Sequence, residues 1–509
     1  MLERVSLSGI PLLMACCWLS AAPAGGRTAG LSVSPVATDS TFRDSSRVDT
    51  IAAGSSPLDS VAPAAAIPVP PHRADARGPF PGASLLLQAP FFDFPYGLDA
   101  GPTSPSMRQS LLWNVGAVQL ADQSIGWLWE GMRPGVWRAL GLYGSLGLFN
   151  YLSVYLPPGQ GWMHEEWHRA VMTRYGISSY DGIYHWNIGA EAVSVDHVKD
   201  ADLADLKARH PADFTRLMEA GIEGETESVR LMRRQNFFLG RQSDYDAVDW
   251  WSSAVNGTAY IYICSIKDYD KDLEKADRAE TIESQRDFTG LDFRAWVYDM
   301  RHPDEAYGAG PRGRTHVTGS GFDRYLLYPD LTAGERDYLR LQAGLSLLNL
   351  VSPQMFGSDW LPGTVPWDGA GILWNFGLVH HLTPFGYEVG GDLLVRRGKW
   401  SWAFSAQGLV NGAMALPGIG GELYRYPLEA GRTHVFLTGG VSAWLQPQDQ
   451  LYRTTSVQPG AAARVGAALP LWSAVEVFAE ADAKTAGWVA GNVYLDAAAQ
   501  GRAGLQLRL

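Results

Sequence analysis

The residues best suited to chemistry lie in one short segment, residues 161–169, which reads Gly-Trp-Met-His-Glu-Glu-Trp-His-Arg. It contains the pattern H-E-x-x-H at His164, Glu165 and His168. Residues four apart lie on one face of an α-helix, so both imidazoles can bind one metal ion. Glu165 would lie beside the open coordination position, where a water molecule binds. The pattern therefore predicts hydrolysis assisted by Zn2+, with Glu165 as the general base.

A catalytic zinc site needs a third ligand from the protein. Glu191 is the first candidate, because it follows His168 in a segment that we expect to be helical. The other candidates are an acidic run and two histidines: Glu223, Glu225, Glu227, His185 and His197. If no metal binds, His164 and His168 are structural residues that form hydrogen bonds inside a polar core.

The segment that follows the motif resembles the thermolysin-like gluzincin metallopeptidases. It reads Glu191-Ala-Val-Ser194-Val-Asp196. That family carries its third zinc ligand in a Glu-Ala-x-Ser-type helix about twenty residues after the second histidine. The resemblance implies that Glu191 is the third ligand and that Asp196 or Ser194 orients the first histidine. It covers about 35 residues and implies that the substrate is a peptide or a protein.

The N-terminal residues have the features of a secretory signal. A charged start is followed by an apolar stretch over Val5–Leu19 and by the small residues Ala22-Pro-Ala24. This order predicts a signal peptide over residues 1–24, and therefore export. Cys16 offers an alternative, since Leu13-Met-Ala-Cys16 resembles the cleavage box of a lipoprotein.

Composition limits the remaining possibilities. The formal net charge is −12 and no run is rich in lysine or arginine, so nucleic acid is not an expected partner. Two of the three cysteines lie in the signal segment, which leaves Cys264 alone and predicts no internal disulfide. Residues 25–80 consist mainly of small and polar residues, and so few apolar groups predict a disordered tether.

Residues 81–356 show the pattern of a mainly helical domain. Ser104 or Ser106 can cap a first helix, and a second helix is expected after Pro134. Its uncharged stretch, Ala139–Pro157, is about long enough to span a bilayer. Its glycines suit close packing in a core, however, so we expect a buried helix. Further helices are expected over residues 201–210, 211–221, 228–238, 250–264 and 332–350.

Residues 357–509 change to the two-residue period of β-strands. In Tyr387–Arg396 the apolar side chains mostly share one face, and the alternation recurs as far as Leu509. About eight to ten such strands, joined by short turns, resemble outer-membrane β-barrel proteins. The resemblance implies a barrel in the outer membrane with lipid as its partner. A soluble β-sandwich is the alternative, because alternation alone does not separate a lipid-facing row from a core-facing row.

Together these patterns predict an α+β multidomain protein, in which a mainly α-helical domain with the H-E-x-x-H helix precedes an antiparallel β-barrel. The expected function is that of a zinc-dependent hydrolase, a peptidase of the bacterial envelope whose helical domain faces the periplasm. One alternative is a non-enzymatic outer-membrane protein with a structural helical domain. The other is a metal-dependent hydrolase of lipid or cell-wall amide bonds, which the aromatic residues around His164 suggest.

Overall fold

The helices of the chain lie between its first strand and a long final run of strands, so the fold is of the α+β class. The computed structural model describes residues 85–100, 104–185, 193–241, 244–365, 369, 371–431 and 433–509. All of them belong to one compact unit. The expected signal and tether, residues 1–80, and the candidate ligand Glu191 lie outside the described residues.

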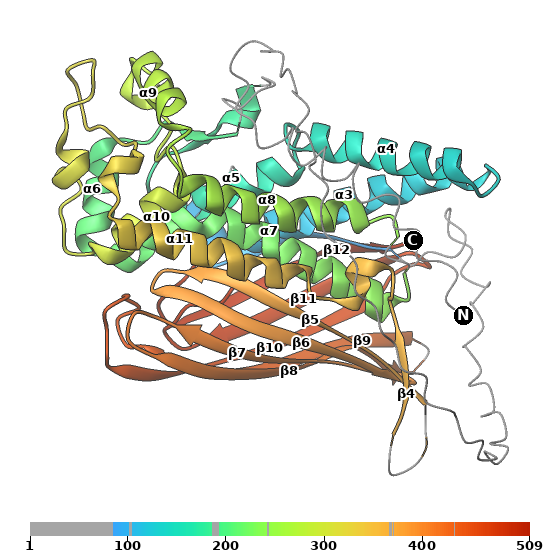
Figure 1. Cartoon of the computed structure of the whole chain (residues 1–509). Coiled ribbons are helices and arrows are strands. Elements are labelled where there is room, and N and C mark those ends of the chain that lie inside the picture. The colour runs from blue at the N-terminus through green and yellow to red at the C-terminus, as the bar shows by residue number, and fades with distance from the viewer. Residues whose placement is uncertain are drawn as a thin grey trace, which may run out of the picture. The chain divides into compact units, whose positions relative to one another are not determined.

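Helices form one layer of the fold (Figure 1). They are α2 (Tyr96–Ala100), α3 (Met107–Glu130), α4 (Val136–Ser153), α5 (Gln160–Arg174), α6 (Asp200–Arg209), α7 (Pro211–Leu239), α8 (Ala247–Cys264), α9 (Asp270–Ala279), α10 (Asp292–Arg301) and α11 (Ala333–Ser346). Short 3-10 helices lie between them: η2 (Gly182–His185), η4 (Glu283–Gln285), η5 (Gly310–Gly313), η6 (Tyr328–Asp330), η7 (Leu347–Leu350) and η8 (Pro353–Phe356). A small hairpin pairs β2 (Tyr180–Asp181) with β3 (Val195–Asp196).

One helix continues where the sequence predicts two. The helices expected over residues 211–221 and 228–238 are both parts of α7. A Cβ atom at Gly221 would lie 2.2 Å from Nε2 of His164. Glycine is therefore needed at this position so that α7 can approach α5 closely, and it does not end the helix.

A ten-stranded antiparallel sheet forms the second layer (Figure 1). Its strands are β1 (Leu86–Phe94), β4 (Leu361–Thr364), β5 (Gly371–Thr383), β6 (Gly386–Arg397), β7 (Trp400–Val410), β8 (Ala415–Ala430), β9 (Thr433–Pro447), β10 (Val457–Pro470), β11 (Val475–Lys484) and β12 (Ala498–Arg508). Their order is β1-β12-β11-β10-β9-β8-β7-β6-β5-β4, so β1, which precedes the helices, pairs with the last strand. The antiparallel strands are confirmed, but among the described residues no pairing of β1 with β4 closes the sheet.

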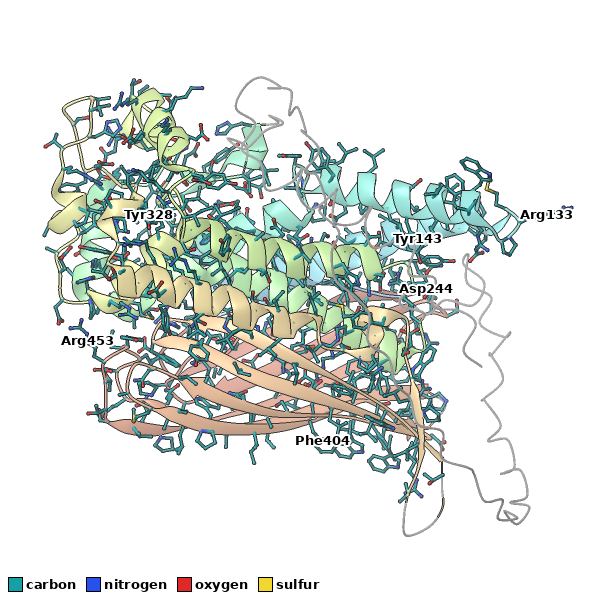
Figure 2. All side chains as sticks on the ribbon, viewed as in Figure 1. Arg133, Tyr143, Asp244, Tyr328, Phe404 and Arg453 are labelled. Carbon is teal, nitrogen blue, oxygen red and sulfur yellow. The ribbon has the colours of Figure 1, made fainter. Side chains whose placement is uncertain are left out.

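The two faces of the sheet differ in polarity. One face carries the apolar row, in which Ile419 is 68% exposed, Val441 68% and Val465 61%. Figure 2 shows Phe404 of this row on the side of the sheet away from the helices. The opposite row includes charged residues such as Glu480 and faces a cavity under the helices. A soluble sandwich would cover the apolar row with a second sheet, and the described chain contains only the small β2–β3 hairpin besides this one.

Helices bridge the two ends of the open sheet. Helix α3 packs along β1, α7 packs against β5, and α3 and α7 pack against each other. A cavity of about 290 Å³ lies between these helices and the inner face of the sheet. Its charged lining residues are Arg108, Glu227, Arg230, Arg234, Glu388, Asp392, Glu422, Arg425, Arg464, Glu480, Asp482, Lys484 and Arg502. The lining of this cavity therefore carries many charged side chains.

The uncharged stretch that we expect to be buried forms an exposed helix instead. It corresponds to α4, of which only Leu142, Leu146 and Ser153 are buried. The two leucines pack in a small cluster with Val248, whereas Trp137 is 77% exposed. The prediction of burial is wrong because composition shows that a helix is apolar but not what covers it. Within the described residues, no helix combines the length and the apolar character needed to cross a bilayer.

Candidate metal centre

The H-E-x-x-H helix lies inside the helical layer. Helix α5 packs against α7 and α3, and every residue from Gln160 to Met172 is buried. The rings of His164 and His168 are adjacent, with centroids 5.0 Å apart. The prediction that these two histidines share one face of a helix is confirmed.

A carboxylate from another part of the chain faces both histidines. Oδ2 of Asp292, the first residue of α10, lies 3.4 Å from Nε2 of His164 and 3.6 Å from Nε2 of His168. One ligand atom from each residue lies within 4.8 Å of the others, and none of the three residues is more than 7% exposed. This group could hold a metal ion, and no other group in the described part of the chain meets the same geometry.

Outer hydrogen bonds orient both imidazoles. Nδ1 of His164 lies 2.8 Å from Oε1 of Glu225, and Nδ1 of His168 lies 2.6 Å from the carbonyl oxygen of Leu217. Since a carboxylate and a carbonyl both accept, a neutral ring at either position would carry its proton on Nδ1 and keep the lone pair of Nε2 for a cation. Metal-binding histidines are held in this way.

One buried nitrogen in the group has no hydrogen-bond partner among the described residues. Nε2 of His168 is buried and forms no hydrogen bond with a described residue, because its distance of 3.6 Å from Asp292 is too long. A buried polar atom left without a partner destabilises a protein. A metal ion between the imidazoles and the carboxylate would satisfy this nitrogen. Two imidazoles and one carboxylate are a donor set that zinc and other divalent transition metals accept.

The turn before α10 positions Asp292. The carboxylate of Asp287 accepts hydrogen bonds from the N–H groups of Phe288 and Gly290, at 2.8 and 2.9 Å. Gly290 has a φ of 77°, which favours glycine. The N–H of Asp292 then donates to the hydroxyl of Tyr260 at 3.2 Å. Asp292 is thus held at the N-terminus of a helix, where the helix dipole favours a negative charge.

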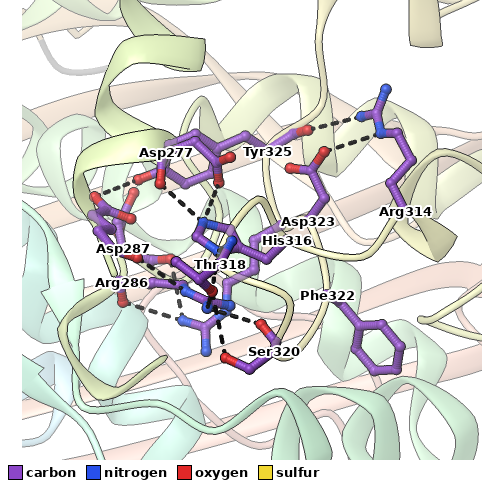
Figure 3. A network of polar contacts seen from close by, with 12 residues as sticks. Asp277, Arg286, Asp287, Arg314, His316, Thr318, Ser320, Phe322, Asp323 and Tyr325 are labelled. Carbon is purple, nitrogen blue, oxygen red and sulfur yellow. Dashed lines mark hydrogen bonds and ion pairs between the residues drawn. The ribbon is translucent and has the colours of Figure 1, made fainter. Parts of the chain in front are cut away.

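A network of hydrogen bonds stabilises the segment that precedes α10 (Figure 3). Nη2 of Arg286 donates to Oγ1 of Thr318 at 3.1 Å and to the carbonyl oxygen of Ser320 at 2.9 Å. Oγ1 of Thr318 also lies 2.8 Å from Nδ1 of the buried His316. Arg324 donates from Nη1 to the carbonyl oxygen of Arg286 at 3.1 Å. These contacts tie the long loop after α10 to the segment just before that helix.

Two carboxyl groups of the site have shifted pKa values. Burial raises the pKa of Glu165 well above its usual value; the charge of His164 opposes this rise, and the charge of Asp181 adds to it. Burial alone would also raise the pKa of Asp292, but the positive charge of the nearby His168, the contact with Nε2 of His164 at 3.4 Å and the charge of His164 hold it below its usual value. Asp292 is therefore ionised and suited to contact a cation, while the raised pKa of Glu165 favours the form that holds a proton.

The acidic run of α7 supplies a hydrogen-bond partner of His164, but none of its residues belongs to the group of His164, His168 and Asp292. Glu225 contacts the ring nitrogen of His164 that points away from Asp292. Glu223 and Glu227 form ion pairs with neighbouring arginines. Glu191 lies outside the described residues, so its role as a ligand stays a prediction.

The other candidates form a separate cluster. Nε2 of His185 lies 3.2 Å from Oδ2 of Asp196, and Nδ1 of His197 lies 2.5 Å from Oδ1 of the same carboxylate. Both histidine side chains are nearly half exposed, at 44% and 47%. In the structure Asp196 thus contacts these two histidines, and the carboxylate that contacts His164 through Nδ1 is Glu225.

Asp292 is the residue that sequence reasoning missed. It lies far along the chain from the motif, and no spacing rule connects the two. Its one local signal is an acidic residue that begins a helix just after Thr289-Gly290, which is common at the N-termini of helices. Comparisons of the chain with models of protein families, with curated proteins and with solved structures give no match.

Proposed function

We propose that the protein is a zinc-dependent hydrolase with His164, His168 and Asp292 as metal ligands. The observation that carries the proposal is the orientation of the two imidazoles. Their Nδ1 atoms are held by outer acceptors, and their Nε2 atoms face one carboxylate oxygen. A structural histidine in a polar core would ordinarily find hydrogen-bond partners inside the protein, whereas Nε2 of His168 has none among the described residues.

The residues around the ligand group suit the hydrolysis of an amide bond. Zinc bound here would supply a Lewis acid that makes a coordinated water more acidic. Glu165 takes a proton from the attacking water and returns it to the leaving nitrogen as the C–N bond breaks, a role that its raised pKa favours. Glu225 holds the ring of His164 through Nδ1 during these steps. A peptide or protein is therefore the proposed substrate.

We also propose that the sheet places the protein in the bacterial outer membrane. Its apolar row lies on the exposed face and its charged row lines a cavity, which is the distribution typical of strands in outer-membrane barrels. Helices α3 and α7 would complete the barrel wall, since they bridge β1 and β5. Lipid would then cover the apolar face, and the metal site would meet its substrate in the periplasm.

A non-enzymatic membrane protein is the second candidate function. The same exposed apolar row supports it, and in that case the ligand group would be structural. The two candidates differ in one property that is simple to measure, because only the hydrolase needs a metal ion.

The test is the zinc content and the peptidase activity of the detergent-purified protein. We expect about one zinc ion per chain in the wild type and none in His168→Ala. His197→Ala replaces a half-exposed histidine outside the ligand group and should keep the zinc. Glu165→Gln should keep the zinc and lose about 10²- to 10⁴-fold in the hydrolysis of a mixed fluorogenic peptide substrate. If the wild type stays metal-free after dialysis against excess zinc, the proposed hydrolase is overturned and the non-enzymatic membrane protein remains.

A further inference from the structure

Helix α4 carries an exposed apolar surface. Trp137 is 77% exposed, Leu148 60% and Leu140 45%. The sequence has no charged residue from Ala139 to Pro157. A helix that is apolar on all sides normally lies in the core of a protein or in a membrane, so the exposed side of α4 needs a cover.

The described chain offers no such cover. Helix α4 packs against α3 and α8 through one stripe that includes Leu142 and Leu146. It lies on the side of the helical layer away from the sheet (Figure 1). Its opposite side, with Leu140 and Leu148, faces outwards. The sheet therefore cannot cover this surface.

The residues at the start of α4 indicate what the cover is. Trp127 and Trp137, on either side of the turn between α3 and α4, are 53% and 77% exposed. Arg133 stands at the tip of this turn (Figure 2), and neither it nor Arg138 forms an ion pair with a described residue. Exposed tryptophans beside unpaired cations are the combination found at the interface of a membrane, where cations meet lipid phosphates.

We propose that α4 lies against a lipid bilayer, with Leu140 and Leu148 in the hydrocarbon, Trp137 at the interface, and Arg133 and Arg138 at the level of the phosphates. The inference extends lipid contact from the sheet to the helical layer. It rests on the proposed membrane location of the protein, and it is independent of the metal site. A second copy of the chain is the competing cover, and the chemistry at the start of α4 favours lipid over it.

The experiment measures the two faces separately. A fluorescent label is attached to Leu148→Cys on α4, to Leu469→Cys on the apolar face of the sheet, and to Lys275→Cys on the exposed surface of α9. The wild-type protein is labelled in parallel, and its fluorescence gives the background signal from its own cysteines. Each protein is reconstituted in vesicles of phosphatidylethanolamine and phosphatidylglycerol. Fluorescence quenching is then measured with two quenchers: lipid that carries a spin label on its acyl chain, and iodide dissolved in the water.

We expect the label at Leu148→Cys to be quenched by the spin-labelled lipid, as at Leu469→Cys, and the label at Lys275→Cys to be quenched by iodide. Iodide quenching at Leu148→Cys together with lipid quenching at Leu469→Cys would overturn the inference and leave the sheet in the membrane. Iodide quenching at both Leu148→Cys and Leu469→Cys would show that neither face contacts lipid, and it would overturn the proposed membrane location. Protection of Leu148→Cys from both quenchers, in a protein that sediments as a dimer, would show that a second copy covers α4 and would also overturn it.

Discussion

The helical layer has an apolar core in which a few charged groups are embedded, while the sheet encloses a polar cavity and exposes its apolar side chains. Around α5 the core includes Met163, Trp167 and Val171, each fully buried. In the sheet the exposed row includes Val441 and Val465. Apolar side chains are stable where water is excluded. The difference is that the protein's own packing excludes water from the helical core, whereas the outer face of the sheet has no cover within the described chain, which is why we propose that lipid covers it.

A second contrast lies within the helical layer. Its buried charges are mostly paired, as at Asp299, which contacts Lys207 at 2.7 Å and Arg312 at 2.6 Å. Nε2 of His168 has no hydrogen-bond partner in the described chain, and the same holds for other buried atoms such as Nε1 of Trp167 and Nε1 of Trp250. It differs from them because it belongs to a group of two imidazoles and a carboxylate that could hold a metal ion. An external cation at this place would therefore satisfy it. Substitutions can test this contrast and the one between the layers.

The largest effect should come from Asp292→Ala, which removes a proposed metal ligand. We expect the affinity for zinc to fall by more than about 100-fold, beyond the range typical of losing an outer partner. Competition with a chromophoric chelator measures it, and Asp272→Ala on the exposed surface of α9 is the matched control. An unchanged affinity would return Glu191 as the best candidate for the third ligand.

The next effect should separate the two faces of the sheet. Val441→Arg places a charge on the exposed apolar row, whereas Ser442→Arg places it in the polar cavity. The first should lower the stability of the membrane-inserted protein by about 2–4 kcal/mol, and the second should change it much less. The yield of folded protein in vesicles along a urea series measures both. Equal losses in the two variants would count against a lipid-facing row.

Glu225→Ala tests the outer contact of His164. Losing the acceptor on Nδ1 should lower zinc affinity by about 10- to 100-fold. Glu225→Gln should lie nearer the wild type, because an amide oxygen still accepts a hydrogen bond. The same chelator competition gives the values. If neither substitution has an effect, the contact does not orient the ring.

The last prediction concerns Asp181, a buried acid outside the metal-binding group. Burial, together with the charge of Glu166, raises the pKa of Asp181 to about 8. The folded protein keeps a proton that the unfolded chain loses near pH 3.9. Stability from this group is present below about pH 4 and is lost as the pH rises to about 8, by at most about 1.4 kcal/mol per pH unit.

Asp181→Asn should remove this part of the pH dependence. The amide oxygen can still accept the hydrogen bond that Oδ1 receives from the N–H of Ile183 at 2.9 Å. The thermal midpoint of the wild type should therefore fall more between pH 5 and pH 8 than that of the variant. Parallel curves for the two proteins would show that Asp181 does not titrate in this range.

Much of the local structure could be predicted from patterns of a few residues. The H-E-x-x-H helix, the N-cap at Ser106 and the alternation in Tyr387–Arg396 all appear as expected. Each depends on backbone geometry or on residues within one turn or one strand, which short-range periodicity records. The same patterns placed His164 and His168 on one side of a helix, because four residues make about one turn.

The rest of the fold and of the candidate site depends on contacts between distant parts of the chain. Asp292 joins the histidines only because α10 packs against α7, and Glu225 contacts His164 only because Gly221 lets α7 approach α5. The pairing of β1 with β12 and the exposure of the apolar rows of α4 and the sheet likewise depend on which elements become neighbours. Periodicity shows that a residue row is apolar, but only packing determines whether protein, water or lipid covers it, because burial is a property of the neighbours and not of the row itself.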